Sequence, residues 1–527
     1  MVNHTPKRIT PSVIVVVLLM TVCTQWALRD IFLEDAYMHI RYAANALETG
    51  VWGCWNIGET PVSGESSPLW LALLLVLSQL GITPLVAAKS LGGIALFACF
   101  IDLIMLYNRK RTTTDRLSEF VFAASLFTLI PLLFYSISGM ETVLFVYLTT
   151  RLTLTPSARW HAWIAIPLVL IRPEGALFVF VLTVTKWWRN WKMIALTGLP
   201  AFGVFVAYLV FHRLYFGDWL PNTYYAKADL PVSHAAAYGL RATALFLKDY
   251  YFVIACAALL LLSRRLDRID VRFVALMATC VFIVLKVGGD NAAAFPHHRH
   301  FLPILGVVWV YAFLFVETVS KHVRFRMLTT VVLVVALSIT HYASESGTEH
   351  SPFTHPKVRL KKIFHLPSVG VPSTPMPTPS FERILSTLPD GALVATGASG
   401  KAPARFLNLK FLDMLGLNDV HISRHGTRQY GQVDTKTDFD YVLRRQPAVI
   451  SLPIASRHVE AGQVQIGQTH WRLLVDQILD DTRLYENYRL IPCSSSAVFA
   501  HTNILSYLSN DMQTSARQYD PGGDAEE

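Results

Sequence analysis

Two neighbouring acids, Glu34 and Asp35, open a segment whose residue types could carry out chemistry. The residues that follow have helical spacing, which places Asp35 and His39 on one face and Glu34 and Arg41 on another. A carboxylate on a rigid helix can act as a general base, and two carboxylates can bind a divalent cation. The structural alternative is that the acids only stabilise the N-terminus of a helix.

Charged residues also interrupt an apolar run. Arg172 and Glu174 lie near the middle of the run 161–185, next to Pro173 and Gly175. Ionisable groups at such a depth are usually functional or paired with each other. We therefore expect either a functional site or a structural arginine–glutamate pair between two short helices.

A third polar segment combines Asp290 with His298, Arg299 and His300 between two apolar runs. Its cations could hold a phosphate group. The alternative is that these residues meet lipid phosphates at the membrane surface. The histidines lack the spacing of a typical zinc site.

Aromatic residues gather in the segment Gly217–Lys227. Tyr224 and Tyr225 lie beside Asn222 and Lys227 in its second half. This grouping could form a platform on which a sugar stacks. It could equally be part of the aromatic belt that membrane proteins place at the lipid–water interface.

The elements that position these residues are predicted to be membrane helices. The 527 residues are 53% hydrophobic and 16% charged, whereas soluble domains have about 25% charged residues. The net charge of +9 lies in basic clusters between the apolar runs, as the positive-inside rule requires. Nucleic-acid binding, cytosolic dehydrogenases and secreted disulfide scaffolds are thereby excluded.

The apolar runs predict an α-helical multi-pass protein with about eleven transmembrane helices. The segment from Arg172 to Gly175 divides one run into two helices, and the short run 68–80 is expected not to cross fully. The runs are 11–28, 84–107, 119–135, 139–153, 161–185, 193–213, 245–262, 271–287, 302–318 and 327–343. This topology places all the polar segments on the extracytoplasmic face, which favours an active site there.

The sequence divides into three parts. Residues 1–343 form the transmembrane domain, with residues 29–67 as its first outer loop, and residues 344–380 read as a linker rich in Pro, Ser and Thr. In residues 381–527, short β-rich runs alternate with helical ones. They predict an extracytoplasmic α/β or α+β domain.

Several motifs occur in a characteristic order along the chain. They are Glu34-Asp35, Arg41-Tyr42-Ala43, Trp55-Asn56, Ser67-Pro68-Leu69-Trp70, Ser138–Glu141, Arg172–Gly175, Gly217–Lys227, Arg299–Pro303 and Leu412–Asp419. Together they resemble the GT-C superfamily of membrane glycosyltransferases, and within it the branch of the mycobacterial terminal β-(1→2) arabinofuranosyltransferases. That branch usually has two aspartates where this chain has Glu34-Asp35.

The resemblance implies transfer of a sugar, such as arabinofuranose, from a polyprenyl-phosphate donor to a cell-envelope glycan or surface-protein acceptor, with inversion. Asp35 is the implied general base and Glu34 a second acid; together they are also the implied ligands of any divalent cation (Mg, Mn or Ca). The implied ligands of the donor phosphate are Arg172, Arg299, His298 and Lys227. The implied pocket residues are His39, Arg41, Glu174, Asn222, Tyr224, Tyr225 and Asp290.

The resemblance also implies a location in the bacterial inner membrane, with active site and C-terminal domain on the periplasmic side. Membrane lipids are further expected partners. Two other classes remain open from the residues alone. A lipid or sugar transporter would show inverted repeats and several broken helices, and a non-catalytic envelope assembly factor would tolerate loss of Asp35.

Overall fold

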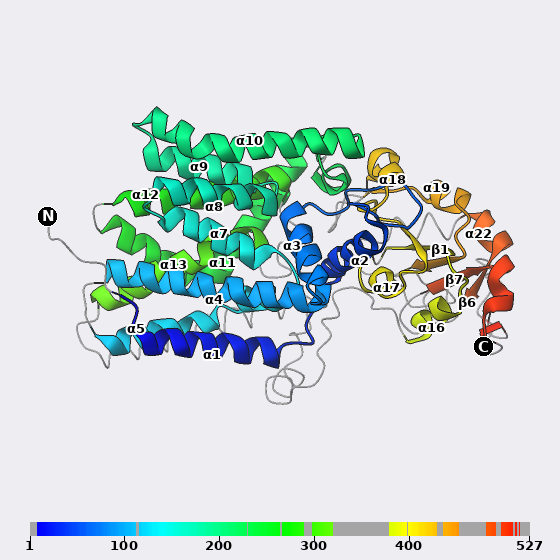
Figure 1. The fold of residues 1–527 in the computed structure, drawn as a ribbon, viewed down its shortest axis with the longest axis horizontal. Helices are drawn as coiled ribbons and strands as arrows, with labels where there is room; N and C mark the ends of the chain where they lie inside the picture. The colour runs from blue at the N-terminus through cyan, green and yellow to red at the C-terminus, as the bar shows by residue number, and fades with distance from the viewer. Residues whose placement is uncertain are drawn as a thin grey trace.

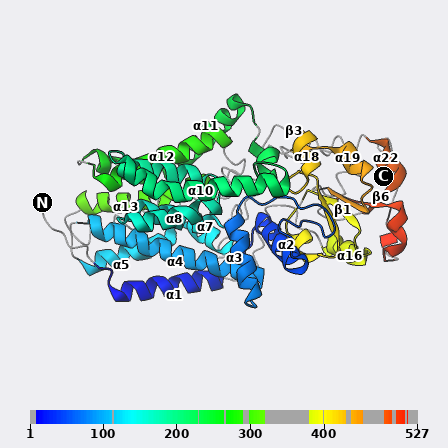
Figure 2. The same ribbon diagram turned by 45° about the horizontal axis from the view of Figure 1, so that its top comes forward.

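The computed structural model describes residues 8–111, 115–228, 230–263, 266–288, 298–319, 379–397, 399–428, 436–452, 481–491, 497–509, 512–513 and 516. A bundle of helices occupies one end of the molecule and a domain containing a β-sheet occupies the other (Figure 1). Helix α2 and the loop after it lie between them in both ribbon views (Figure 2). We call the end of the bundle away from the sheet its distal end.

Nearly every predicted apolar run contains a helix. The helices of the bundle are α1 (Pro11–Ala27), α3 (Pro68–Gln79), α4 (Pro84–Lys110), α5 (Arg116–Ser125), α6 (Ile130–Ile137), α7 (Thr142–Leu154), α8 (Ala158–Ile171), α9 (Gly175–Trp187), α10 (Trp191–Phe216), α11 (Val232–Leu262), α12 (Arg268–Val287) and α13 (Leu302–Val319). Helix α4 lies centrally, in contact with α1, α6, α7 and α13. The predicted break between α8 and α9 is confirmed.

Two predicted boundaries are wrong. The run 119–135 is not one helix, because α5 and α6 meet at a bend of 62°. Leu129 has non-helical angles, and Pro131 lies in the first turn of α6; proline lacks the amide proton that a continuous helix needs. Helix α11 begins at Val232, well before the predicted run 245–262, because its first turns are alanine-rich and favour a helix without being strongly apolar.

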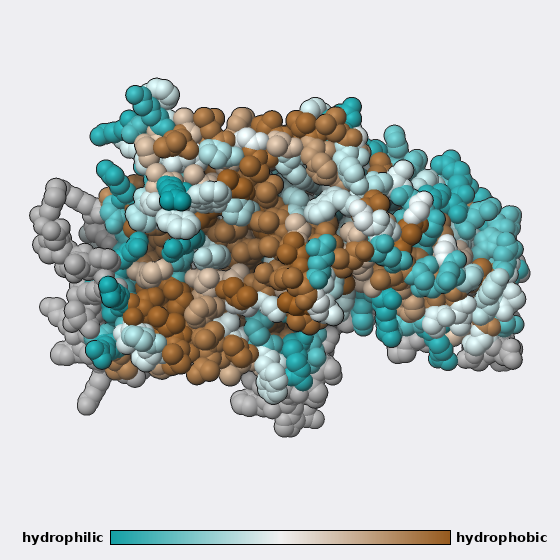
Figure 3. Space-filling model, viewed as in Figure 1, coloured by the Kyte–Doolittle hydropathy of each residue, from teal (hydrophilic) through white to brown (hydrophobic). Residues whose placement is uncertain are grey.

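The length and composition of the helices identify an integral membrane protein. Among the described residues, four helices are long and apolar enough to span a membrane, or five if the bent pair α5–α6 is one span. The predicted count of about eleven spans is not confirmed, and the run 327–343 lies outside the described residues. On the face shown in Figure 3, apolar side chains are concentrated on the bundle, whereas hydrophilic ones are concentrated on the sheet domain and at the distal end.

The C-terminal domain, residues 379–516, contains the predicted α/β arrangement. Its mixed five-stranded sheet has the order β2 (Lys410–Asp413), β1 (Leu393–Thr396), β5 (Val449–Leu452), β7 (Ala497–His501) and β6 (Tyr488–Ile491). Strand β1 runs parallel to β2 and β5, whereas β7 is antiparallel to both of its neighbours. Strand β2 is an edge strand, and this edge faces the bundle.

Short helices and a small second sheet complete the domain. They are α16 (Pro379–Thr387), α17 (Lys401–Arg405), α18 (Val420–His425), α19 (Phe439–Arg444), α22 (Thr482–Asn487), and the paired strands β3 (Thr427–Arg428) and β4 (Lys436–Thr437). Helices α17 and α18 lie on the side of the domain that meets the bundle (Figure 1).

Candidate active site

Helix α2 (Glu34–Thr49) carries the two acids at its first turn. It begins where the Leu33 amide donates to the Ser138 carbonyl oxygen at 2.9 Å, and it ends at Gly50 in the left-handed conformation. Asp35 is exposed, whereas His39 and Arg41 on the following turns are buried. The helix therefore exposes Asp35 to solvent, while the side chains of its following turns are buried.

The buried face of α2 is not purely apolar. It contains Ala36 and Ala43, but also polar residues such as Arg41 and Asn45. These polar side chains are buried because the C-terminal domain and the loop 50–67 supply hydrogen-bond partners for them.

A buried polar network lies beneath α2 and joins three of the predicted segments. His39 Nδ1 is 3.7 Å from Glu65 Oε2, and His39 Nε2 is 3.9 Å from Glu141 Oε2. Glu141 Oε1 lies 3.0 Å from Arg172 Nη1, and Glu174 Oε1 lies 2.6 Å from Arg172 Nη2. The first outer loop, the Ser138–Glu141 turn and the Arg172–Gly175 turn thus meet at one place.

Burial changes the protonation of this network. It raises the pKa of Glu65 to about 8, despite a hydrogen bond from the Ser67 amide, so Glu65 is mostly protonated at neutral pH. Burial lowers the pKa of His39, against the attraction of Glu141 and Asp35. The network therefore holds a proton on a carboxyl group beside a largely neutral imidazole.

Glu65 and Glu141 are functional candidates that the sequence did not single out. Glu65 precedes the Ser67-Pro68 motif, and Glu141 ends the Ser138–Glu141 motif. Each is an isolated acid, and nothing in its local spacing indicates a partner. The packing of α2 against the turn at Gly139 brings Glu141 to His39, and a Cβ at Gly139 would lie 2.2 Å from the Phe32 ring. Glu65 reaches His39 from the loop that follows α2.

Glu34 has a different environment from Asp35. Its Oε1 accepts hydrogen bonds from the backbone amides of Gly400 and Lys401, at 3.0 and 2.9 Å. Burial raises the pKa of Glu34, and these two amides oppose that rise. The second acid thus fastens α2 to the start of α17.

Arg41, expected in a pocket, is fully buried between the two parts of the molecule. Its guanidinium donates to the carbonyl oxygens of Trp55, Leu409 and Pro403, and to Asn56 Oδ1. Burial lowers its pKa to about 10, so it stays charged at neutral pH. Through these hydrogen bonds Arg41 connects α2 and the loop after it to the C-terminal domain.

The loop after α2 covers the edge of the C-terminal sheet. Asn56 Oδ1 accepts from the Phe411 amide at 2.8 Å, and Asn56 Nδ2 donates to the Phe411 carbonyl oxygen at 3.1 Å. Trp55 Nε1 donates to the same oxygen. The side-chain amide of Asn56 thus pairs with β2 much as a neighbouring strand would.

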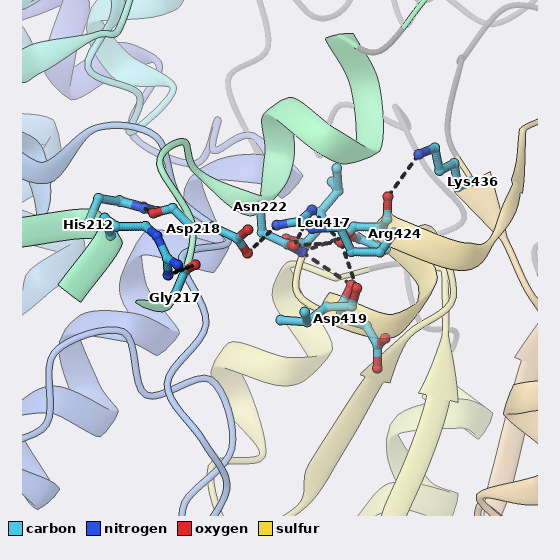
Figure 4. A network of polar contacts seen from close by, with 12 residues as sticks. His212, Gly217, Asp218, Asn222, Leu417, Asp419, Arg424 and Lys436 are labelled. Carbon is cyan, nitrogen blue, oxygen red and sulfur yellow. Dashed lines mark hydrogen bonds and ion pairs between the residues drawn. The ribbon is translucent and has the colours of Figure 1, made fainter. Parts of the chain in front are cut away.

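Asn222 forms a second connection between the two parts (Figure 4). Its amide nitrogen donates to the carbonyl oxygens of Gly416, Leu417 and Asp419, at 2.9 to 3.2 Å. Its oxygen accepts from Ser423 Oγ. Asn222 was expected to line a pocket, and in the structure it binds the loop that precedes α18.

The neighbouring aromatic residues are only partly free. The Arg424 guanidinium lies 3.4 Å from the centre of the Tyr225 ring, and Arg424 also pairs with Asp218. Tyr224 is exposed, and Lys227 is half-buried. Tyr224 and Trp219 are therefore the accessible aromatic side chains of this segment.

The histidine segment begins α13 on the other side of the Arg172 turn. His298 Nε2 lies 2.7 Å from Asp249 Oδ2, so this histidine is bound to α11. Burial raises the pKa of Glu174, but the charges of Arg172 and then His300 outweigh it, so the pKa of Glu174 is lowered. Arg299 lies between the two histidines and is partly buried, and Asp290 lies outside the described residues.

Among the described residues, no group of three or more His, Cys, Asp or Glu side chains is suited to a metal ion. Of the two expected cation ligands, Glu34 accepts two backbone amides at its Oε1 atom, and Asp35 is exposed. A divalent cation bound by these two acids stays a prediction.

Similarity to solved structures identifies the architecture. ArnT from Cupriavidus metallidurans, in its apo state and bound to undecaprenyl phosphate, superposes with a TM-score of 0.54 at 11–12% identity, over 94% of this chain and 98% of ArnT. The fold is similar to the GT-C fold of ArnT. The mycobacterial arabinofuranosyltransferase AftD superposes over 97% of this chain and 42% of its own, at 14% identity and a TM-score of 0.48.

The sequence itself matches no protein-family model and no curated protein. The similarity to ArnT therefore defines a shared fold, and the chemistry has to be argued from the residues of this chain.

Proposed function

We propose that the protein is a membrane glycosyltransferase that uses a polyprenyl-phosphate sugar as donor. The observation that carries this proposal is the arrangement of α2, which exposes Asp35 while the opposite side of the helix is anchored by buried polar contacts. The bound undecaprenyl phosphate of ArnT, a protein of similar fold, supports a lipid-phosphate donor.

In the proposed reaction, Asp35 removes the proton from an acceptor hydroxyl group. The oxygen attacks the anomeric carbon of the donor sugar, the bond from that carbon to the phosphate oxygen breaks, and polyprenyl phosphate leaves with the bonding electrons. The configuration at the anomeric carbon is inverted. Asp35 holds the proton until it passes to solvent.

The leaving phosphate gains charge, and nearby cations would stabilise it. Our candidates are the four cations predicted from the sequence, Arg172, Arg299, His298 and Lys227; in the structure Arg172 also pairs with two glutamates and His298 with Asp249. In this proposal Arg172 and Glu174 shape the site. Tyr224 offers an exposed ring against which the donor or acceptor could stack.

For the sugar and acceptor, we propose arabinofuranose transferred to a cell-envelope glycan or a surface protein, at the outer face of a bacterial inner membrane. This part rests on the ordered motifs of the sequence alone.

The test is transfer from radiolabelled polyprenyl-phosphate arabinose, catalysed by purified protein in vesicles that contain acceptor. We expect Asp35→Asn to reduce the rate at least about 10²-fold, because it keeps the size of the side chain and removes the base. Glu48→Gln, an exposed acid on the same helix, is the matched control and should keep full activity.

Two results would contradict parts of the proposal. Undiminished transfer by Asp35→Asn would exclude Asp35 as the base. Transfer from other polyprenyl-phosphate sugars, but not from the arabinose donor, would overturn the sugar assignment while leaving the base in place.

A further inference from the structure

A group of cations and tryptophans lies at the distal end of the bundle. We call it the distal basic rim: Arg159, Trp160 and Trp163 at the start of α8, and Lys186, Trp188, Arg189, Trp191 and Lys192 around the turn from α9 to α10. Helices α8 and α10 pack against each other, and the turn between α9 and α10 lies far from the C-terminal domain (Figure 1).

The rim has no acidic residues of its own. Segments 155–163 and 184–193 contain four cations and no Asp or Glu. Within the part of the chain that the structure describes, no carboxylate lies within 4 Å of Arg159, Arg189 or Lys192, and all three are exposed. Their charge is therefore not neutralised by any carboxylate of the described residues.

Some other cations of the bundle are neutralised internally. Lys110 lies 2.7 Å from both Asp267 and Asp270, and Arg111 pairs with Glu119. Both of these cations are largely buried. Exposed cations such as Arg116 and Arg268 have no carboxylate within 4 Å among the described residues either, so what distinguishes the rim is the exposed tryptophans beside its cations.

Indole rings hold the rim cations in place. The Arg189 guanidinium lies 4.4 Å from the centre of the Trp188 ring, and Lys192 Nζ lies 6.0 Å from that of Trp191. Trp188 and Trp191 are 67% and 73% exposed. Exposed indoles belong at the lipid–water boundary, where the apolar ring meets acyl chains and the adjacent cation meets headgroups.

We infer that the distal basic rim is a binding surface for anionic phospholipid headgroups. Such headgroups supply the negative charge that the described residues do not place beside the rim, and attraction by each Lys or Arg near an anionic membrane surface is appreciable. The alternative is that these cations only orient the chain during membrane insertion. In that case the mature protein would not distinguish anionic from zwitterionic lipids.

The test measures lipid selectivity directly and is independent of any enzymatic activity. The full-length protein is reconstituted in phosphatidylcholine bilayers, and electron spin resonance compares the association of spin-labelled phosphatidylglycerol and phosphatidylcholine. We expect the wild type to prefer phosphatidylglycerol by roughly fivefold. The preference should weaken in 1 M salt, which screens charge beyond about 3 Å.

The triple variant Arg159→Gln, Arg189→Gln, Lys192→Gln should reduce the preference to less than about twofold. The control variant Arg383→Gln, Arg405→Gln, Arg444→Gln removes the same charge from the C-terminal domain, where all three residues are exposed, and should keep the wild-type preference. A wild type without preference, or a triple variant with unchanged preference, would overturn the inference.

Discussion

At the residue scale, two adjacent acids have opposite environments. Asp35 is exposed, whereas Glu34 is bound by amides of the C-terminal domain. The sequence could identify both acids as candidate site residues, because their position at the start of a helix is visible in the local pattern. It could not predict that their environments differ, because the partners of Glu34 lie more than 360 positions away in the chain.

Arg41 provides a prediction about stability. Arg41→Lys keeps the charge but loses the planar group that serves several acceptors at once. Because a lysine cannot serve the carbonyl oxygens of Leu409 and Pro403 together with Asn56 Oδ1, we expect the free energy of unfolding to fall by about 2–4 kcal/mol. Thermal unfolding of the purified protein measures this change.

The control for Arg41 is Arg444→Lys. Arg444 is exposed and pairs with Asp440 on the surface, so its replacement should change stability by less than about 0.5 kcal/mol. Equal effects of the two variants would mean that Arg41 does not fasten the domains.

Glu65 provides a prediction about pH. Its pKa is about 8 in the folded protein, against 4.5 for an exposed glutamate, so between these values the folded state binds more protons than the unfolded state. Its contribution to stability therefore falls as pH rises through this window, with a slope approaching about 1.4 kcal/mol per pH unit.

Glu65→Gln should remove this contribution, because glutamine resembles the protonated acid. We expect the melting temperature of the variant to match the wild type near pH 4.5 and to exceed it at pH 8. If the melting temperatures of the variant and the wild type differed by the same amount at every pH in this range, the pKa of Glu65 would not be raised.

At the element scale, proline and glycine explain both the success and the failure of the sequence analysis. The Arg172–Gly175 break was predicted because Pro173 and Gly175 follow a charged residue. The bend before Pro131 was missed because only apolar residues surround it. Apolarity predicts where helices lie in the chain, but it does not reveal where a run of such residues changes direction.

Gly175 allows the close approach of α9 to α8. A Cβ at this position would lie 1.9 Å from the Leu168 carbonyl oxygen. We therefore expect Gly175→Ala to displace the turn that holds Arg172 and Glu174, with loss of stability and of sugar transfer. Melting temperature and transfer rate measure the two effects.

Gly203→Ala is the matched control, because Gly203 lies inside α10 and a Cβ there would meet nothing within 4 Å. Alanine should stabilise that helix by up to about 1 kcal/mol. Normal transfer by Gly175→Ala would show that the position of the Arg172–Glu174 turn is not critical.

At the scale of the whole molecule, the joint between bundle and sheet could not be predicted. The sequence analysis expected two parts with a linker, and placed Arg41 and Asn222 in a pocket. In the structure both residues donate to backbone carbonyl oxygens of the C-terminal domain. A backbone acceptor leaves no mark in the sequence, so such contacts escape any analysis of residue types.

Amide hydrogen exchange tests the contact between Asn56 and strand β2. Asn56→Ala removes the acceptor of the Phe411 amide, and we expect that amide to exchange at least about tenfold faster. Asn408→Ala, at an exposed asparagine that binds Asp390 within the same domain, should leave Phe411 protected. Unchanged protection in Asn56→Ala would mean that β2 does not depend on the loop.

The covered edge of β2 also bears on how the protein is made. An uncovered strand edge can pair with other chains and aggregate. Here the covering loop, with Trp55 and Asn56, is translated long before Lys410–Asp413. When the strands of the sheet leave the ribosome, the loop that covers the edge of β2 has already been synthesised. The order of synthesis therefore limits the time during which this edge could pair with another chain and aggregate.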